Sequence, residues 1–268
     1  MPTIISFNLI DCYFRKMRLL LFILFNLIIT SANAQDNYEI QVYGSESVGK
    51  GRTMVELHSN FNFKGTNLLE NGEYSSEHTF HETIEITHGI TRCFELGLYL
   101  FNSIGDKNRT GFVGSHLRPR ITAPEKWKLP VGLSLSFEFG FQKAEYSANT
   151  ATLEMRPIID KKWKAFYISF NPVLEKSFKG PDESNGLDFS PNIKACYDIN
   201  KKIALGLEYY GGMGRVLELS ALKDGQHQLF VITDIDFGEK WEFNAGFGYG
   251  LTESTEKASF KLILGHKF

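Results

Sequence analysis

The chain repeatedly alternates apolar and polar residues, and the clearest example is segment 131–142. Successive side chains of a β-strand point to opposite faces, and a strand that crosses a membrane needs about 9–11 residues of this kind. The segment therefore predicts a strand with an apolar outer face and a small or polar inner face. The apolar positions are Val131, Leu133, Leu135, Phe137, Phe139 and Phe141, and the opposite positions are Gly132, Ser134, Ser136, Glu138 and Gly140.

The same alternation predicts about 12 strands, an even number, as in bacterial single-chain barrels. We expect a closed, antiparallel, up-and-down transmembrane β-barrel, the fold of an outer-membrane protein in a Gram-negative bacterium. The expected strands are 53–63, 79–89, 94–101, 111–121, 131–142, 151–159, 165–175, 187–198, 203–211, 228–237, 241–251 and 258–268. The pattern is weakest in 228–237, where Asp234 and Asp236 share a face with Phe230 and Ile232.

The connections between these strands alternate between longer, polar loops and shorter turns. Outer-membrane barrels have short periplasmic turns and longer external loops, so the alternation places both chain ends on the periplasmic side. Trp127, Trp163 and Trp241 fall in or beside the shorter connections. Tryptophan rings favour the membrane interface, and the three residues therefore predict a periplasmic girdle.

The N-terminus has the features of a cleaved secretory signal. Met17 and Arg18 precede an 11-residue run, 19–29, interrupted only by Asn26, and a small-residue site ends at Ala34. The run is too short to span a membrane as a helix. We expect cleavage after Ala34 whether translation starts at Met1 or Met17, which leaves residues 35–268 as the barrel.

Composition narrows the function classes. Hydrophobic residues make up 43% of the chain and aromatic residues 14%, yet mean hydropathy is −0.19, which is too polar for a helical membrane bundle. Loss of residues 1–34 would remove three of 29 basic and one of 31 acidic residues, giving a formal net charge of −4. That charge does not indicate nucleic-acid binding. We expect outer-membrane lipid and, through the C-terminal Phe268, the barrel assembly machinery as partners.

Four parts of the mature chain share a further likeness, namely 88–100, 117–120 with 130–133, 153–159 and 204–211. They resemble the outer-membrane proteins grouped as "MetA-pathway of phenol degradation-like". The resemblance covers most of the mature chain and implies an outer-membrane barrel that passes small aromatic or apolar compounds, without established catalytic residues.

The inner faces of the expected strands are rich in charge. Approximate hairpin pairing places Glu56 opposite Glu85, Glu85 opposite Glu95, Glu95 near Arg118, and Glu138 near Arg156. Like charges that face each other destabilise a sheet unless cations or protons intervene, and Arg forks suit carboxylates. The set either fills the lumen as an internal ion-pair network or lines a solute path. The predicted network is Glu56, Glu85, Glu95, Arg118, Arg120, Glu138 and Arg156.

Other candidate chemistry is weaker. His58 and His81 could approach each other across the first hairpin, but isolated lumen histidines are commoner than ligands, so neither a metal site nor a cofactor is predicted. Cys93 and Cys196 fall on strands that are not neighbours and are expected to be lone thiols rather than a disulfide. Gly residues in 243–250 have no helix after them, which argues against a dinucleotide loop.

Three functions follow from these features. The first is a passive channel or uptake protein for small solutes, and the second is a plugged structural or adhesive barrel. The third, a lipid-hydrolysing barrel, is disfavoured because alternation places Ser59 and Ser115 on the faces opposite to those of His58 and His116. We therefore expect a protein without enzymatic activity.

Overall fold

The computed structural model describes residues 38–65, 73–106 and 109–268, all of which belong to one compact unit. The predicted signal peptide, residues 1–34, lies outside the described residues. No helix in the described part of the chain is long and apolar enough to cross a membrane.

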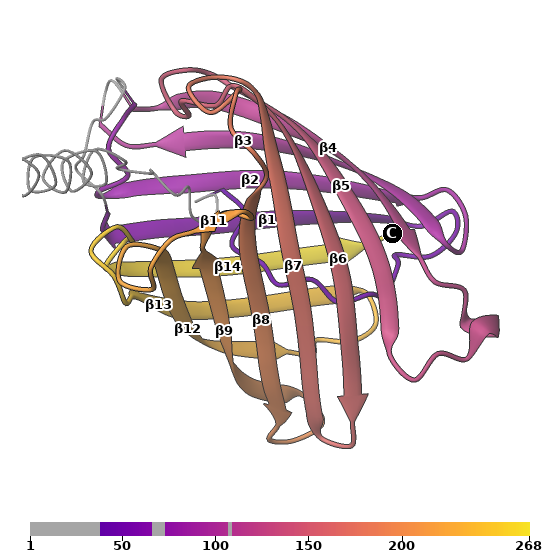
Figure 1. Cartoon of the computed structure of the whole chain (residues 1–268). Helices are drawn as coiled ribbons and strands as arrows, with labels where there is room; N and C mark the ends of the chain where they lie inside the picture. Colours follow the sequence, from indigo (N-terminus) through magenta and orange to yellow (C-terminus); the bar gives the residue numbers. More distant parts are fainter. Residues whose placement is uncertain (1–37, 66–72, 107–108) are drawn as a thin grey trace, which may run out of the picture. The chain divides into compact units, whose positions relative to one another are not determined.

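Twelve long antiparallel strands form a closed barrel, as the alternation predicts (Figure 1). Each strand pairs with the next along the chain, and β1 pairs with β14 to complete the ring. The strands are β1 (Thr53–Lys64), β2 (Thr79–Gly89), β3 (Phe94–Ile104), β4 (Gly111–Thr122), β5 (Gly132–Gln142), β6 (Ala151–Trp163), β7 (Phe166–Lys179), β8 (Asp188–Asp198), β9 (Ile203–Gly212), β12 (Gln226–Ile235), β13 (Trp241–Gly250) and β14 (Ala258–Lys267).

Strand β2 illustrates how the sequence determines the two faces. Its residues alternate between buried and exposed along the whole strand. Phe80, Ile84 and Ile86 are exposed on the outside, whereas His81 and Glu85 are buried in the lumen. An apolar outer face and a polar inner face are what a barrel in a lipid bilayer requires.

Several strands extend beyond the predicted ends. Strand β6 continues to Trp163 and β7 to Lys179, and Lys161 and Lys162 still pair with Ile168 and Tyr167 across their turn. Backbone pairing does not depend on side-chain hydrophobicity. Strand ends placed where the apolar residues stop therefore come too early. The loop after β9 also contains a small hairpin of β10 (Gly214–Arg215) and β11 (Glu218–Leu219), which alternation does not reveal.

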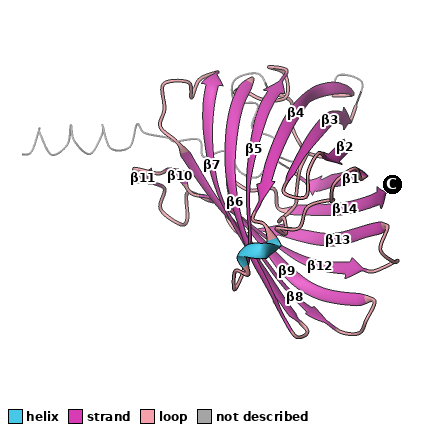
Figure 2. Ribbon diagram, turned by 90° about the vertical axis from the view of Figure 1, so that its right-hand side faces the viewer, coloured by secondary structure: helices cyan, strands magenta, loops and turns pink. Residues whose placement is uncertain are grey.

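The connections alternate in length around the two rims, as expected. The short turns lie at 90–93, 164–165, 199–202 and 236–240, on the rim where β1 begins and β14 ends. The longest connection on this rim, between β4 and β5, contains the 3-10 turn η2, Glu125–Trp127 (cyan in Figure 2). Cys93 and Cys196 are free thiols, as predicted.

Strand β12 carries two apolar residues, Phe230 and Ile232, on its inner face between Gln228 and Asp234. Phe230 and Ile232 are 0% and 2% exposed, whereas Val231 on the outer face is 63% exposed. The face that Phe230 and Ile232 share with Asp234 therefore points into the lumen. Apolar side chains in this position require an apolar partner inside the barrel, since a polar lumen would not cover them.

Candidate functional site

The lumen is occupied by residues 38–48 of the chain itself, here called the luminal segment (part of the indigo trace in Figure 1). The segment has no regular secondary structure, and most of its side chains from Tyr38 to Ser45 are buried. A buried extended chain must find partners for its backbone amide and carbonyl groups. The partners here are side chains of the barrel wall.

The middle of the luminal segment is held most closely at Tyr43. The backbone amide of Tyr43 donates to Asn171 Oδ1 at 2.8 Å. Its carbonyl oxygen accepts from Ser169 Oγ at 2.6 Å and from Asn171 Nδ2 at 3.1 Å. Both wall residues come from β7, where a spacing of two places them on the same inner face. The pair thus satisfies both backbone groups of one buried residue.

The flanking residues are held in the same way. Lys261 Nζ donates to the Ile40 carbonyl at 3.1 Å, and Val48 donates its backbone amide to Glu95 Oε2 at 2.9 Å. Thr83 donates to the Tyr38 carbonyl, and Arg156 donates to the Gln41 carbonyl. Arg120 donates to the carbonyls of Gly44 and Glu46, and Ser134 and Thr122 both donate to the Ser45 carbonyl. The donors belong to β2, β4, β5, β6, β7 and β14, so the segment contacts most of the lumen wall.

All seven residues of the predicted charge network are buried in the lumen. Arg118 contacts Glu85 at 2.5 Å and Glu95 at 3.4 Å, and Arg120 contacts Glu95 at 2.5 Å. Arg118 reaches both carboxylates because its direct partner on β3 is Gly97, which leaves room for the guanidinium. Glu56 lies directly opposite Glu85, as predicted.

One of the expected pairings differs from the structure. Glu85 lies opposite Tyr99, and Glu95 is displaced toward the short-turn rim, opposite Gly89. The register of this hairpin depends on how its turn closes, which alternation alone does not define.

Arg156 lies near Glu138, as expected, diagonally across the β5–β6 pair, because its direct partner on β5 is Ser136. Glu138 lies opposite Glu154, and Arg156 pairs with Glu154 at 2.6 Å and with Glu39 of the luminal segment at 3.9 Å. The second partner was missed because residues before the first strand were not placed in the lumen.

Tyr43 lies at the centre of the charged wall. Its hydroxyl donates to Glu39 and lies 2.9 Å from the Tyr99 hydroxyl. The guanidinium carbons of Arg118 and Arg156 lie 5.3 Å and 4.8 Å from the centre of its ring. A cation near an aromatic face is attracted to the ring quadrupole. Tyr43 therefore links the luminal segment to two arginines of the predicted network.

The opposite wall holds the luminal segment by apolar packing. Ile40 and Val42 belong to one buried cluster with Cys196 of β8, Phe230 and Ile232 of β12, and Tyr210 of β9. This cluster covers the apolar face of β12. Beside it, Lys261 pairs with Glu208, while Lys194 pairs with Asp234 at 2.9 Å.

Two cavities of about 560 Å³ and 280 Å³ lie within the lumen and have no lining residue in common. Residues Gln41 to Gly44 line the larger cavity, which extends to the short-turn rim at Trp241 and Lys267. Tyr38 and Glu39 line the smaller cavity, toward the long-loop rim. The luminal segment therefore lies between the two spaces.

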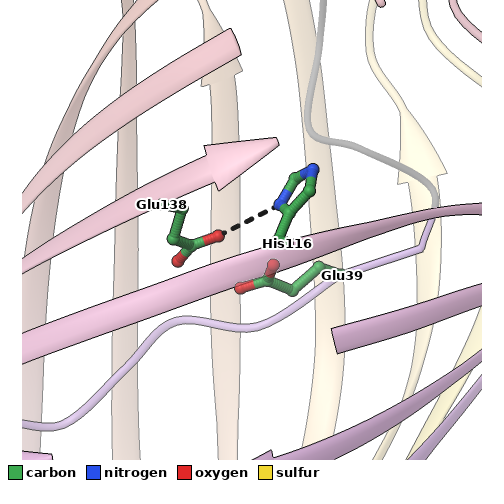
Figure 3. Close-up of side chains that lie close together, drawn as sticks. All are labelled: Glu39, His116 and Glu138. Atoms are coloured by element: carbon green, nitrogen blue, oxygen red, sulfur yellow. Dashed lines mark hydrogen bonds and ion pairs between the residues drawn. The ribbon is translucent and has the colours of Figure 1, made fainter. Parts of the chain in front are cut away.

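Glu39, His116 and Glu138 lie close together at the smaller cavity (Figure 3). His116 Nδ1 is 3.5 Å from Glu138 Oε2, and Glu39 also contacts Tyr43 and Arg156. Protein partners thus already surround Glu39. A second group, Glu56, His58 and Glu85, lies near the larger cavity.

The remaining sequence-based candidates are placed as follows. Trp127, Trp163 and Trp241 are exposed on the short-turn rim, by 60%, 68% and 47%. Ser59 bonds to Glu82 on the outer face, whereas His58 is buried in the lumen, so the two do not form a nucleophile–base pair. The C-terminal Phe268 is 70% exposed on the same rim as the tryptophans.

Comparison with known proteins identifies the fold. Neither a protein-family model nor a curated protein matches the chain, so the resemblance to the phenol-degradation-like family has no support from a family model. The KdgM porin superposes with a TM-score of 0.52 at 10% identity, over 80% of this chain and 99% of that chain. The fold is that of the outer-membrane porins.

Two further solved structures show the same likeness. The KdgM porin in complex with disordered oligogalacturonate gives a TM-score of 0.53 at 9% identity, over 80% of this chain and 99% of that chain. The NanC porin gives 0.51 at 8% identity, over 80% and 98%. At these identities, the likeness concerns the fold and not the solute.

Proposed function

We propose that the protein is a bacterial outer-membrane channel for small solutes that its own luminal segment closes. The observation that carries this proposal is the position of residues 38–48 between two luminal cavities. The porin fold and the apolar outer face support a place in the outer membrane. Solutes would pass only when the segment moves, and the short-turn rim would face the periplasm.

The way the segment is held favours a closure that can be released. Most of its bonds to the wall are side-chain hydrogen bonds to backbone groups, each worth about 1 kcal/mol net. Water can replace such bonds when the segment leaves, whereas the strand ladder of the barrel remains intact. The polar, charged wall would then surround a hydrated path. The resemblance to the phenol-degradation-like family points to aromatic or apolar solutes, but this charged wall favours small polar ones.

Conductance in planar bilayers tests the proposal. We expect low conductance from the protein beginning at Gln35 and sustained conductance from a variant that lacks residues 38–48. A third sample would carry V42C in a C93S background, with residue 42 cross-linked to the native Cys196 of the same cluster by a short thiol reagent. Locking the segment in this way should abolish channel openings, and cleavage of the cross-link should restore them.

The competing function is a permanently plugged structural barrel, favoured by the burial of the segment. Absence of conductance from a folded variant without residues 38–48 would support that function and contradict the channel. Resistance to unfolding in detergent would establish that the variant is folded. We also infer that the barrel is not a lipid hydrolase, because Ser59 and His58 lie on opposite faces of β1. Lipid turnover by the purified protein, lost on substitution H58Q, would contradict this inference.

A further inference from the structure

We propose that Glu56, His58 and Glu85 form a binding site for a divalent transition-metal cation such as Zn²⁺ in the lumen wall. Glu56 and His58 are two residues apart on the inner face of β1, and Glu85 of β2 lies directly opposite Glu56. One ligand atom from each of the three residues lies within 4.8 Å of the other two. The three side chains thus converge from two paired strands.

The distances suit a zinc-class ion. His58 Nε2 lies 3.5 Å from Glu85 Oε2. Zinc binds His nitrogen and carboxylate oxygen at 2.0–2.2 Å, so two ligands of a tetrahedral ion are about 3.3 Å apart. The His–Glu separation already approaches this value, and rotation of the Glu56 side chain would bring in the third ligand.

Unpartnered polar atoms provide a second, independent observation. His58 and Glu85 are both 0% exposed. Within the described residues, neither ring nitrogen of His58 makes a hydrogen bond, and Glu85 Oε2 accepts none. Buried polar atoms of this kind are uncommon, and a bound ion is one of the established reasons for them. Of these atoms, His58 Nε2 and Glu85 Oε2 face each other.

The charges around the site lead to the same conclusion. Arg118 binds Glu85 through Oε1, which leaves Oε2 facing His58. Arg118 and Arg120 are both engaged with Glu95 as well. The Glu56 carboxylate has no ion pair or hydrogen bond among residues 38–65, 73–106 and 109–268. Glu56 and Glu85 therefore face each other in the lumen, and of the two carboxylates Glu85 alone has an arginine partner among the described residues. A divalent cation would balance this surplus of negative charge.

The site also has a route of entry. Glu56 and Glu85 line the larger cavity, which reaches the short-turn rim, where Glu242 is exposed. Gly265 separates Glu56 from Glu242 in the sheet, and a Cβ atom at this position would lie 2.9 Å from Glu56 Cγ. The glycine thus leaves space beside the proposed ligand. Glu242 could attract a cation from the rim toward the site.

The ligand set distinguishes between classes of metal. One imidazole and two carboxylates leave a fourth position for water, as in zinc and related transition-metal sites. Calcium prefers six to eight oxygen ligands, which this group does not supply. Magnesium is usually held by carboxylates and several waters, without imidazole. We therefore expect Zn²⁺ and Co²⁺ to bind, and Ca²⁺ and Mg²⁺ to bind much more weakly.

Calorimetric titration of the metal-free, refolded barrel with Zn²⁺ tests the site. We expect one bound ion, and at least about a 100-fold weaker affinity in H58Q and E56Q, because even outer contacts to ligands are worth 10- to 100-fold. The matched control is H81Q, since His81 is a buried lumen histidine of the same hairpin outside the group. Its affinity for Zn²⁺ should equal that of the unmodified protein.

Co²⁺ provides a readout that does not depend on mutant folding. The visible absorption of the Co²⁺-loaded, unmodified protein should show a four-coordinate site, and competition with Zn²⁺ should remove the bands. Absence of Zn²⁺ binding, or binding that H58Q and E56Q leave unchanged, would overturn the proposal. Either result would mean that His58 and Glu85 contact each other without a shared metal ion. Neither measurement depends on channel conductance, so a failure of zinc binding would leave the channel function untouched, and a failure of conductance would leave the metal site untouched.

Discussion

From Glu39 to Tyr43, the two walls of the lumen hold the luminal segment mainly by different interactions, whereas Tyr38 packs against Tyr99 and Phe101 of β3. On one wall, β1 to β6 contribute a network of carboxylates and arginines that contacts Glu39, Tyr43 and the segment's carbonyl groups. On the other, β8, β9 and β12 contribute an apolar cluster around Ile40 and Val42. The charged wall requires defined geometry, because hydrogen bonds are directional. The apolar wall depends on contact area and is less sensitive to orientation.

Because of this difference, we expect the two walls to affect stability and docking differently. Buried charges that lose one partner are strongly destabilising, so the charged wall links the segment to the integrity of the barrel. Apolar side chains of the segment can leave their wall without leaving a charge behind. We therefore expect the charged wall to determine whether the barrel is stable and the apolar wall to determine how tightly the segment is docked.

The largest effect should come from breaking the charged wall at Arg156. Substitution R156A removes the guanidinium that pairs with the largely buried Glu154 at 2.6 Å and contacts Glu39 of the luminal segment. Removal of one partner of a buried ion pair costs about 3–5 kcal/mol. We expect a loss of this size in the free energy of unfolding, measured by denaturant titration of the barrel in lipid vesicles.

Two variants make this test specific. K162A breaks the largely exposed pair between Lys162 and Asp198 and should change the unfolding free energy by less than about 1 kcal/mol. The double variant R156A/E154Q removes the stranded carboxylate as well and should regain part of the stability. Equal effects of R156A and K162A would contradict the role assigned to the charged wall.

The barrel strands could be predicted from the sequence because a bilayer imposes a strict period of two. Glu56 was therefore placed correctly opposite Glu85, and all seven network residues face the lumen. The register between β2 and β3 could not be predicted, because it depends on the conformation of the turn that joins them. In the structure, this register places Glu85 opposite Tyr99. A long arginine side chain such as Arg118 can bridge residues that are not direct neighbours, which pairing rules do not capture.

The luminal segment could not be predicted because its contacts leave no repeating pattern. Its backbone is satisfied by single side chains from separate strands, such as Asn171 and Lys261. One signal was present in the sequence: Phe230 and Ile232 shared a face with Asp234, which is unusual for either a lipid or a water environment. An inward apolar face of this kind indicates an internal partner, and the structure identifies it as Ile40 and Val42.

The next largest effect should come from the apolar wall, through I40A. Ile40 belongs to the segment and not to the barrel, so its truncation should weaken docking while leaving the strands intact. Loss of a buried Ile side chain costs about 2–5 kcal/mol, and 2 kcal/mol corresponds to about a 30-fold shift in an equilibrium. Native Cys196, 3% exposed within the same cluster, reports segment release.

The measurement is the rate at which a thiol reagent labels Cys196 in a C93S background. We expect I40A to accelerate labelling by about 30-fold or more and to leave the unfolding free energy of the strands nearly unchanged. The control is V231A, which truncates an outward side chain of β12 that is 63% exposed. Unchanged labelling in I40A would show that apolar packing does not govern docking.

The smallest effect should come from a single hydrogen bond at the centre of the segment. Ser169 donates to the Tyr43 carbonyl, but Asn171 donates to the same oxygen, so S169A leaves that carbonyl with one donor. A net loss of about 1 kcal/mol corresponds to about a fivefold faster labelling of Cys196. S59A, which removes a hydroxyl bonded to Glu82 on the outer face, should have no effect on labelling. If S169A accelerated labelling as strongly as I40A, the directional bonds rather than the apolar contacts would control docking, and the division between the two walls would be wrong.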